Sequence, residues 1–402
     1  MAALSVTTAF GPLCCPPKGL AQAWVQTSAP STNWSCVACS ADCSRIVAGV
    51  SNGLIYASAD SGLSWTQSPA PVNAWRDLAS SWDATWIFAA CHGLYFSSNS
   101  AASWAPVTNA FTPISVACSA DASNVAVAIG GGGYGPAVYV STNFGGDWTL
   151  LGPLAEPVGE TVGPIRSSAD GSVLVVVTAD HYSSPSAVIL TPASNWSNHT
   201  IGADFAYRSC PAVAMSFDGA TIVLPALWDT NVMPPPTNCP GLLYSTTNAG
   251  MTVITNCTAV SNWTALACSA DGTRDVVVAN TGEIYRSVDS GTTWQPDAAP
   301  TASWTGVASS ADGFKLVAVA RGGGIYTWQG TPKPVLNIER AGGGLLFSWG
   351  VPSAIVSLQE GTNLAGPWSP EAATPAINYS NLQYQVSLPA PAGTRFYRLA
   401  SQ

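Results

Sequence analysis

Few residues of this sequence could carry out chemistry, and several of them are close together in the chain. Asp180, His181 and Tyr182 are consecutive, while Arg166 and Arg208 each precede or begin a strand-like segment. Side chains of these types can exchange protons with a bound substrate or orient it. We therefore take these five residues as the candidates for a catalytic site. No two of the three histidines share a short ligand spacing, so we expect no metal site and no cofactor.

An eight-residue pattern recurs along most of the chain. It is Ser-Ala-Asp-Ser-Gly-Leu-Ser-Trp at 58–65 and Ser-Val-Asp-Ser-Gly-Thr-Thr-Trp at 287–294, with degenerate copies at 97–104, 141–148 and 246–252. The aspartate can accept hydrogen bonds from its own turn, the glycine can adopt positive φ, and the indole can pack against the hairpin. We predict structural roles for the residues of the two complete copies, namely Asp60, Gly62, Trp65, Asp289, Gly291 and Trp294.

The pattern S/T-x-D-x-G-x-T/S-W resembles the Asp-box, or BNR, repeat of sialidase-like β-propellers. The resemblance implies that the chain folds into radial four-stranded blades. It also implies that the boxes lie on the face opposite the ligand site.

A second turn motif counts the repeats more completely. Ser-Ala-Asp, or a close variant, recurs at spacings of roughly 40 to 50 residues, the period of a four-stranded blade. Its aspartates are Asp42, Asp83, Asp121, Asp170, Asp218, Asp271 and Asp312. The seventh unit reaches Pro332 before a fourth strand can form. Residues 23–27, in contrast, have the pattern of a fourth strand but precede the first unit. We predict an all-β, seven-bladed β-propeller over 21–331, closed by this N-terminal strand in the last blade.

The segments outside the propeller depart from the repeat. Residues 1–20 have no periodic pattern and predict an irregular N-terminal arm. Beyond 334, alternating strands without a box predict a small β-sandwich over 332–402. Its stretch at 361–368 resembles the short C-terminal modules of some bacterial secreted repeat proteins.

We expect function on the face opposite the boxes. Loops between second and third strands and between blades emerge there, and the insertions fall in them, at 129–136, 151–163, 179–186, 197–207 and 226–240. Loop growth on one face of adjacent repeats indicates a binding surface. The candidates for ligand binding are Trp34, Trp75, Arg76, His92, Tyr134, Tyr207, Trp228 and Asp229.

Tryptophan also recurs directly before the predicted inner strand, at Trp34, Trp75, Trp263 and Trp304. Each indole could fill the wedge between neighbouring blades. Alternatively, several could line the channel mouth and stack on sugar rings. The burial of the four side chains distinguishes these interpretations.

The resemblance also raises catalytic possibilities. Sialidase-like enzymes use three arginines, a tyrosine activated by glutamate and an acid/base aspartate, and propeller polysaccharide lyases use histidine, tyrosine and arginine. The Arg-Ile-Pro motif of sialidases is missing here, and no single loop carries an acid/base pair. We therefore favour a non-enzymatic binding or structural propeller, a protein–protein interaction or surface-assembly subunit. The alternatives are a lectin-like carbohydrate-binding propeller and a glycan-active enzyme, either a sialidase-like hydrolase or a polysaccharide lyase.

Eleven cysteines cannot all pair within one chain, because their number is odd. Cys39, Cys118 and Cys268 occupy equivalent positions in blades that are not neighbours, so we expect buried free thiols there. The disulfide candidates fall in or beside the fifth blade and between the arm and the first blade. They are Cys210, Cys239 and Cys257, and Cys14, Cys15, Cys36 and Cys43.

Composition restricts partners and location. Only 9% of the 402 residues are charged, and the formal charge is −9 with 13 Lys plus Arg, so no basic patch for a nucleic acid is expected. No apolar run approaches the roughly 18 residues of a membrane span, and 1–20 lacks a signal-peptide pattern. We expect a secreted or cell-surface protein whose partners are other chains, including copies of itself through the arm or the C-terminal domain, or glycans. Glycosylation candidates are Asn33, Asn195, Asn198, Asn256, Asn262 and Asn378.

Overall fold

The structure is a computed structural model of the chain. It describes residues 23–401 except 109–111, 131–136, 152–160, 180–185, 191–198, 202–207, 229–240, 259, 261, 332–333, 352–355, 379–382 and 392. Over these ranges every regular element is a β-strand. No helix in the described ranges is long and apolar enough to cross a membrane.

Most of the chain forms antiparallel sheets of four or five short strands. One sheet contains β6 (Asp77–Ser80), β7 (Ile87–Ala90), β8 (Leu94–Ser97) and β9 (Ala105–Pro106). The next contains β10 (Pro113–Cys118), β11 (Val125–Ile129), β12 (Ala137–Ser141) and β13 (Thr149–Leu150). A third contains β14 (Thr161–Ser167), β15 (Leu174–Ala179), β16 (Ser186–Leu190) and β17 (His199–Ile201).

Two further sheets continue the series. One contains β18 (Arg208–Ser209), β19 (Ala214–Met215), β20 (Ile222–Trp228), β21 (Gly241–Thr246) and β22 (Ile254–Thr258). The other contains β23 (Trp263–Cys268), β24 (Asp275–Ala279), β25 (Ile284–Ser287) and β26 (Gln295–Pro296). In each sheet the chain order follows the strand order, as expected for successive hairpins.

The two ends of the repeat region meet in one eight-stranded sheet. It joins β1 (Val25–Gln26), β27 (Trp304–Ser309), β28 (Lys315–Gly323) and β29 (Ile325–Gln329) to β2 (Thr32–Cys39), β3 (Ile46–Val50), β4 (Ile55–Ser58) and β5 (Thr66–Gln67). Val25 pairs with Thr327 and Gln26 with Tyr326, so the prediction that the segment around Trp24 completes the last unit is confirmed.

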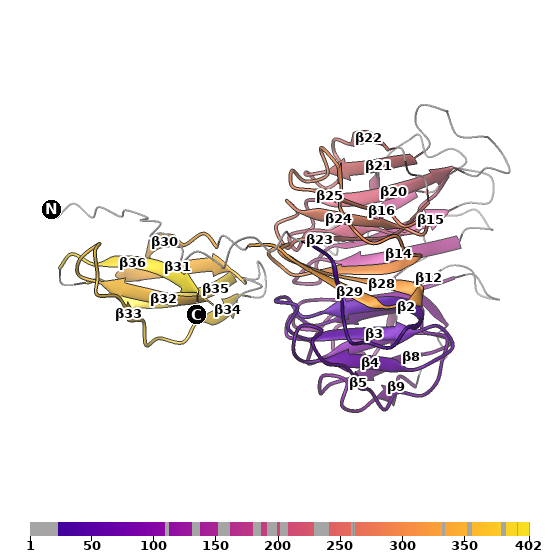
Figure 1. The fold of residues 1–402 in the computed structure, drawn as a ribbon, viewed down its shortest axis with the longest axis horizontal. Coiled ribbons are helices and arrows are strands. Elements are labelled where there is room, and N and C mark those ends of the chain that lie inside the picture. Colours follow the sequence, from indigo (N-terminus) through magenta and orange to yellow (C-terminus); the bar gives the residue numbers. More distant parts are fainter. Residues whose placement is uncertain are drawn as a thin grey trace.

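A closed ring of backbone hydrogen bonds links the sheets around a central axis. In each Ser-x-Asp turn, the residue before the aspartate donates its amide to the carbonyl of the equivalent residue in the next turn, at 2.6 to 2.9 Å. The ring runs through Ala41, Trp82, Ala120, Ala169, Phe217, Ala270 and Ala311, and returns to Ala41. We call these seven residues the base ring. Sheets arranged around an axis in this way form a β-propeller (Figure 1).

The C-terminal residues form two smaller sheets around one apolar core. One sheet has the order β30 (Asn337–Ala341), β31 (Gly344–Gly350), β35 (Gln383–Pro389), β34 (Ala376–Asn378), and the other β33 (Ser369–Pro370), β32 (Val356–Gly361), β36 (Phe396–Ser401). Phe347, Trp349, Leu358 and Val386 are buried between them. We call this part the C-terminal module; it lies at one end of the propeller (Figure 1).

Candidate functional site

A cavity of about 210 Å³ lies at the mouth of the central channel. Its lining comes from the beginnings of the inner strands β2, β6, β10, β14, β23 and β27, and from Pro211 and Ala212 between β18 and β19. Each of these strands leads away from the cavity to a turn of the base ring. The cavity is therefore at the end of the channel opposite the base ring, on the face where the sequence predicted function.

One ion pair crosses the mouth between two sheets. An Nη1 of Arg166 lies 3.2 Å from Oδ2 of Asp77 and also donates to the carbonyl of Ile165 at 2.7 Å. The same Asp77 oxygen accepts hydrogen bonds from the Ser115 hydroxyl and, at 3.2 Å, from the amide of Val116. Because Asp77 accepts hydrogen bonds from β10 as well as from Arg166, the pair links β6, β10 and β14 and holds the Arg166 guanidinium in the cavity lining.

Arg76 adds a second guanidinium to the cavity lining. Its side chain is exposed, and the described residues give it no ion pair. The described lining therefore carries two positive charges and one negative charge, in a chain whose formal charge is −9. A cavity of this kind favours an anionic or hydrogen-bond-accepting group on a ligand.

Hydroxyl groups near the mouth link neighbouring sheets. Ser35 donates to the carbonyl of Trp75 at 2.8 Å, Thr264 to that of Trp304 at 2.9 Å, and Thr305 to that of Trp34 at 2.9 Å. These hydroxyls were not among the predicted site residues. The signal was present as a Ser or Thr directly after Trp34, Trp263 and Trp304.

The four tryptophans that precede inner strands are buried, with exposed fractions between 0% and 2%. Trp34 packs with Val317 and Val319 of β28, and Trp75 with residues of β2 and β3. The interpretation that they fill the wedges between blades is confirmed. The prediction that Trp34 and Trp75 bind a ligand is wrong, because neither indole face is free to stack on a sugar.

The other predicted site residues differ in how far the structure describes them. His92 is exposed between β7 and β8 but does not line the cavity. For Arg208 and Trp228 the structure describes only the backbone, in β18 and β20. Six candidates lie outside the described residues: Tyr134, Asp180, His181, Tyr182, Tyr207 and Asp229. Of the five catalytic candidates, only Arg166 is placed in the cavity.

The eight-residue turns have the structural role that the sequence predicted. Asp60 accepts the amide of Ser64 at 2.8 Å, and Trp65 donates its indole N–H to Gly62 at 3.2 Å. Hydrogen bonds from the Ser64 hydroxyl and amide hold the pKa of Asp60 below its usual value. The equivalent bonds in the other complete copy join Asp289 to Thr293, and Trp294 to Gly291. Both glycines have positive φ, +88° for Gly62 and +74° for Gly291.

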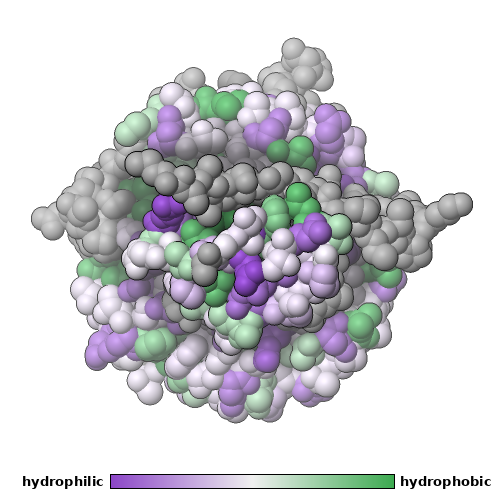
Figure 2. Space-filling view, turned by 90° about the vertical axis from the view of Figure 1, so that its left-hand side faces the viewer, coloured by the Kyte–Doolittle hydropathy of each residue, from purple (hydrophilic) through white to green (hydrophobic). Residues whose placement is uncertain are grey.

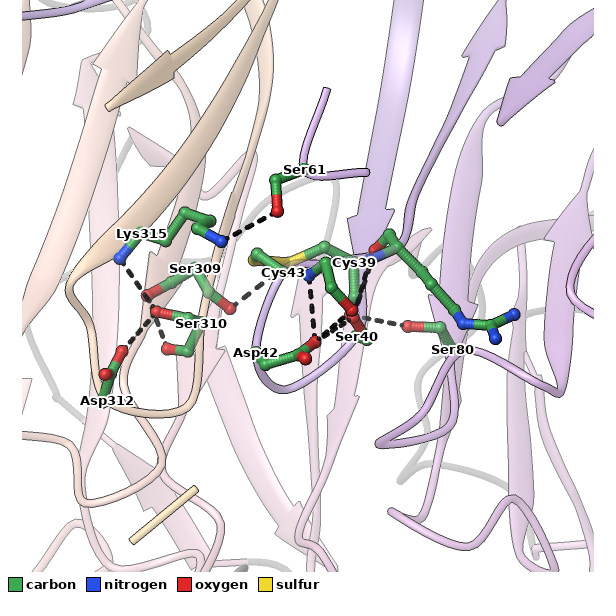
Figure 3. The surroundings of a disulfide bond; sticks show 12 residues. Cys39, Ser40, Asp42, Cys43, Ser61, Ser80, Ser309, Ser310, Asp312 and Lys315 are labelled. Atoms are coloured by element: carbon green, nitrogen blue, oxygen red, sulfur yellow. Dashed lines mark hydrogen bonds between the residues drawn. A yellow bond between two sulfur atoms is a disulfide. The ribbon is translucent and has the colours of Figure 1, made fainter. Parts of the chain in front are cut away.

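The cysteines correct one expectation. Cys39 forms a disulfide with Cys43, so Cys39 is not a free thiol and Cys43 does not pair with the arm (Figure 3). Cys39 ends β2, and Cys43 lies across the tight turn with a Cα–Cα distance of 5.0 Å, which is suitable for a disulfide. Comparison of Cys39 with the equivalent positions in other blades predicted a free thiol, whereas its disulfide partner is only four residues away in the sequence.

The other cysteines whose side chains the structure describes are free. Cys118 and Cys268 are free thiols as expected, and so are Cys36 and Cys210, which were disulfide candidates. Burial raises the pKa of Cys36, Cys118 and Cys210 to about 12, so these thiols stay protonated at neutral pH. Cys14, Cys15 and Cys239 lie outside the described residues, as does the side chain of Cys257.

Three sequons can be assessed in detail. Asn33 and Asn262 are exposed, whereas the amide nitrogen of Asn256 donates to the Gly291 carbonyl at 2.7 Å. In the sequons at Asn33 and Asn262, the tryptophan fills a wedge and the hydroxyl residue links two sheets. The repeat architecture alone therefore accounts for these two motifs. Asn378 is half-buried in β34, and Asn195 and Asn198 lie outside the described residues.

Comparison with solved structures identifies the fold. No protein-family model matches the chain, and no curated protein matches its sequence. YCF48 from Cyanidioschyzon merolae is similar in structure at 15% identity and a TM-score of 0.56, covering 76% of this chain and 99% of that one.

Two other structures are similar over comparable lengths. Hydrazine synthase from Kuenenia stuttgartiensis has a TM-score of 0.60 at 14% identity, covering 77% of this chain and 98% of that one. A structure of YCF48 bound to D1 peptide has a TM-score of 0.55 at 13% identity, covering 82% of this chain and all of that one. At these identities the comparisons show the β-propeller fold alone.

Proposed function

We propose that this protein is a secreted or cell-surface, non-enzymatic scaffold that binds a segment of another protein chain at the mouth of its central channel. The observation that carries the proposal is the cavity opposite the base ring, where Arg166 is held by Asp77 and Arg76 is exposed. A peptide backbone and one anionic group would suit this lining, because guanidinium groups form strong hydrogen bonds with carboxylates and carbonyls. A similar propeller structure, YCF48, is described as bound to a peptide.

The architecture in this proposal follows the repeat count. The propeller has seven blades over 21–331, its eight-residue turns are Asp boxes, 1–20 is an arm, and 332–402 is a β-sandwich. The seven-membered base ring and the hydrogen bonds of Asp60 and Asp289 support this assignment. Burial of the four inner-strand tryptophans removes the main argument for a lectin, because no stacking surface remains there.

Panning a random-peptide phage library on the full-length protein tests the proposal. We expect selected peptides to carry an acidic group and to bind more weakly as salt concentration rises. Calorimetry with one synthetic peptide should show that Arg76→Ala lowers affinity by about tenfold or more, because a charge-assisted hydrogen bond contributes about 1.5–3 kcal/mol.

Arg340→Ala is the matched control, since Arg340 is exposed on β30 of the C-terminal module. It should leave the affinity unchanged. Equal affinity of the wild type and Arg76→Ala for every selected peptide would show that the channel mouth is not the binding site.

A further inference from the structure

The base ring presents an unusual set of side chains. Five of its seven members are alanine, while Trp82 and Phe217 are large. Two alanines separate these aromatic residues on one side of the ring and three on the other. The small side chains leave room at the axis of the propeller, and the two aromatic residues border that space.

Residues of the C-terminal module fill this space. Val351 directly follows β31 and is only 2% exposed, and it clusters with Ala41, Ala120 and the other ring alanines. Ile377 of β34 and Tyr384 of β35 pack against the same cluster, as do Trp82 and Phe217. Seen from the module's side, the module stands in front of the propeller disc (Figure 2).

The contact connects the core of the module directly to the ring. Tyr384 belongs to both clusters, and its ring lies 5.8 Å from that of Trp349, a buried residue of the module. Burial, with the Asp42 carboxylate nearby, raises the pKa of Tyr384. The Tyr384 side chain therefore lies between the two parts and not in open solvent.

Val335, in the segment that joins the two parts, takes no part in this contact. Val335, just before β30, is 64% exposed and belongs to neither cluster. Val335 is thus exposed in the connection, whereas Val351 is buried at the axis of the propeller. The contact between the two parts is therefore made through Val351, Ile377 and Tyr384 and not through Val335.

We propose that the base ring is a receptor for the C-terminal module of the same chain, with Val351 as the residue that occupies it. The ring takes a β-branched apolar side chain flanked by an aliphatic and an aromatic one. Docking covers the base of the propeller and leaves the channel mouth as the exposed end of the channel.

Small-angle X-ray scattering of the full-length protein tests this proposal. Val351→Asp places a carboxylate among the ring alanines, and we expect the radius of gyration and the maximum dimension to increase at unchanged molecular mass. Val335→Asp introduces the same charge at an exposed valine and should leave both values as in the wild type.

A second variant changes the receptor and leaves the module intact. Ala169→Trp adds bulk where Ala169 clusters with Val351, and the ring already accommodates an aromatic residue at two positions. We expect the same increase in dimensions, with the near-ultraviolet circular dichroism of a folded protein. This variant separates release of the module from its unfolding.

Two outcomes would overturn the proposal. One is scattering identical to the wild type for both Val351→Asp and Ala169→Trp, since the ring would then not hold the module. The other is a wild-type dimer, measured by light scattering, that dissociates in Val351→Asp, since the receptor would then be occupied by the module of a second copy.

Discussion

Asp275 begins β24 at a position that is apolar in the six other Ser-x-Asp repeats. The equivalent residues, all buried, are Ile46, Ile87, Val125, Leu174, Ile222 and Leu316. Asp275 is 2% exposed, and neither of its carboxylate oxygens makes a hydrogen bond of normal geometry with a described residue. Burial, with smaller contributions from Asp271 and Asp289, raises its pKa to about 8. A buried carboxyl without a partner is expected to be protonated at neutral pH.

Asp275 should make the stability of the protein fall as pH rises. The unfolded chain ionises this carboxyl near pH 4 and the folded protein only near pH 8, so folding takes up a proton between these values. Below about pH 4 the effect is absent. Between about pH 4 and about pH 8, this carboxyl lowers the unfolding free energy by about 1.4 kcal/mol per pH unit. Above about pH 8 the loss is complete.

Denaturant unfolding of Asp275→Asn at several pH values measures this effect. We expect the difference in unfolding free energy between variant and wild type to grow from pH 4 to pH 8. Asp60→Asn is the control, because the pKa of Asp60 is lowered and its contribution is lost only as pH falls below about 4. A difference for Asp275→Asn that does not vary between pH 4 and pH 8 would contradict the assignment.

The Cys39–Cys43 disulfide is not required for the turn that it closes. Cys43 has φ +48°, and the equivalent Ala84 and Ala122 have +52° and +65° in turns with the same Ser-to-Asp hydrogen bond. We therefore expect Cys43→Ala to fold normally and to lose about 2 kcal/mol, the value for closing so short a loop. Dithiothreitol should lower the unfolding free energy of the wild type but not of the variant. Unfolded Cys43→Ala would contradict this expectation.

At the scale of the strands, the sequence predicted most of what forms. The repeats were expected to be four-stranded, and in the first of them β2, β3, β4 and β5 follow one another around the turn at Asp42 and the eight-residue turn at 58–65. The prediction succeeded because short alternating segments bounded by Asp, Gly and Ser specify hairpins. Docking of Val351 on the base ring could not be predicted in this way, since it depends on side chains from distant repeats that share no local pattern.

The site was only partly predictable. Arg166 was expected to precede or begin a strand, and Arg76 to lie on the face opposite the boxes. Both line the cavity, although Arg166 lies near the end of β14 and Arg76 directly before β6. The partners that fix Arg166 come from β6 and β10, whose side chains meet only after the ring of sheets has closed. The burial of Trp34 and Trp75 has the same origin, because a wedge exists only between two folded blades.

Because β1 closes the propeller, we expect substitution of Trp24, directly before β1, to lower the stability of the whole propeller. Trp24 is 6% exposed, donates its indole N–H to Asp297 at 2.9 Å and lies 6.2 Å from Trp304 between ring centroids. We expect Trp24→Ala to lower the unfolding free energy by about 3–5 kcal/mol in urea denaturation. Val25→Ala, at a 62% exposed neighbour, should cost far less. Equal costs would show that closure does not depend on Trp24.

For the whole molecule, the cavity at the mouth and the base ring lie at opposite ends of the central channel. The seven backbone hydrogen bonds of the base ring join main-chain atoms, so they do not depend on the C-terminal module being docked. The charged groups of the mouth belong to β6, β14 and the residue before β6. Among the residues that the structure describes, the apolar cluster that joins the module to the propeller is formed with the turns at the opposite end. Docking or release of the module at the base ring should therefore not change peptide binding at the mouth.

This separation predicts how the two proposed contacts combine. Val351→Asp should release the module and yet bind a peptide selected on the wild-type protein with the same affinity, because Arg76 and the Asp77–Arg166 pair are untouched. Arg76→Ala should have the opposite pair of effects. It should lower the affinity for the peptide and leave the scattering profile unchanged. Titration calorimetry and scattering on the two variants and the double variant measure both effects. Additive behaviour is expected, since mutations at distant sites without shared partners are usually independent. A weaker peptide complex in Val351→Asp would show that the docked module shapes the binding face.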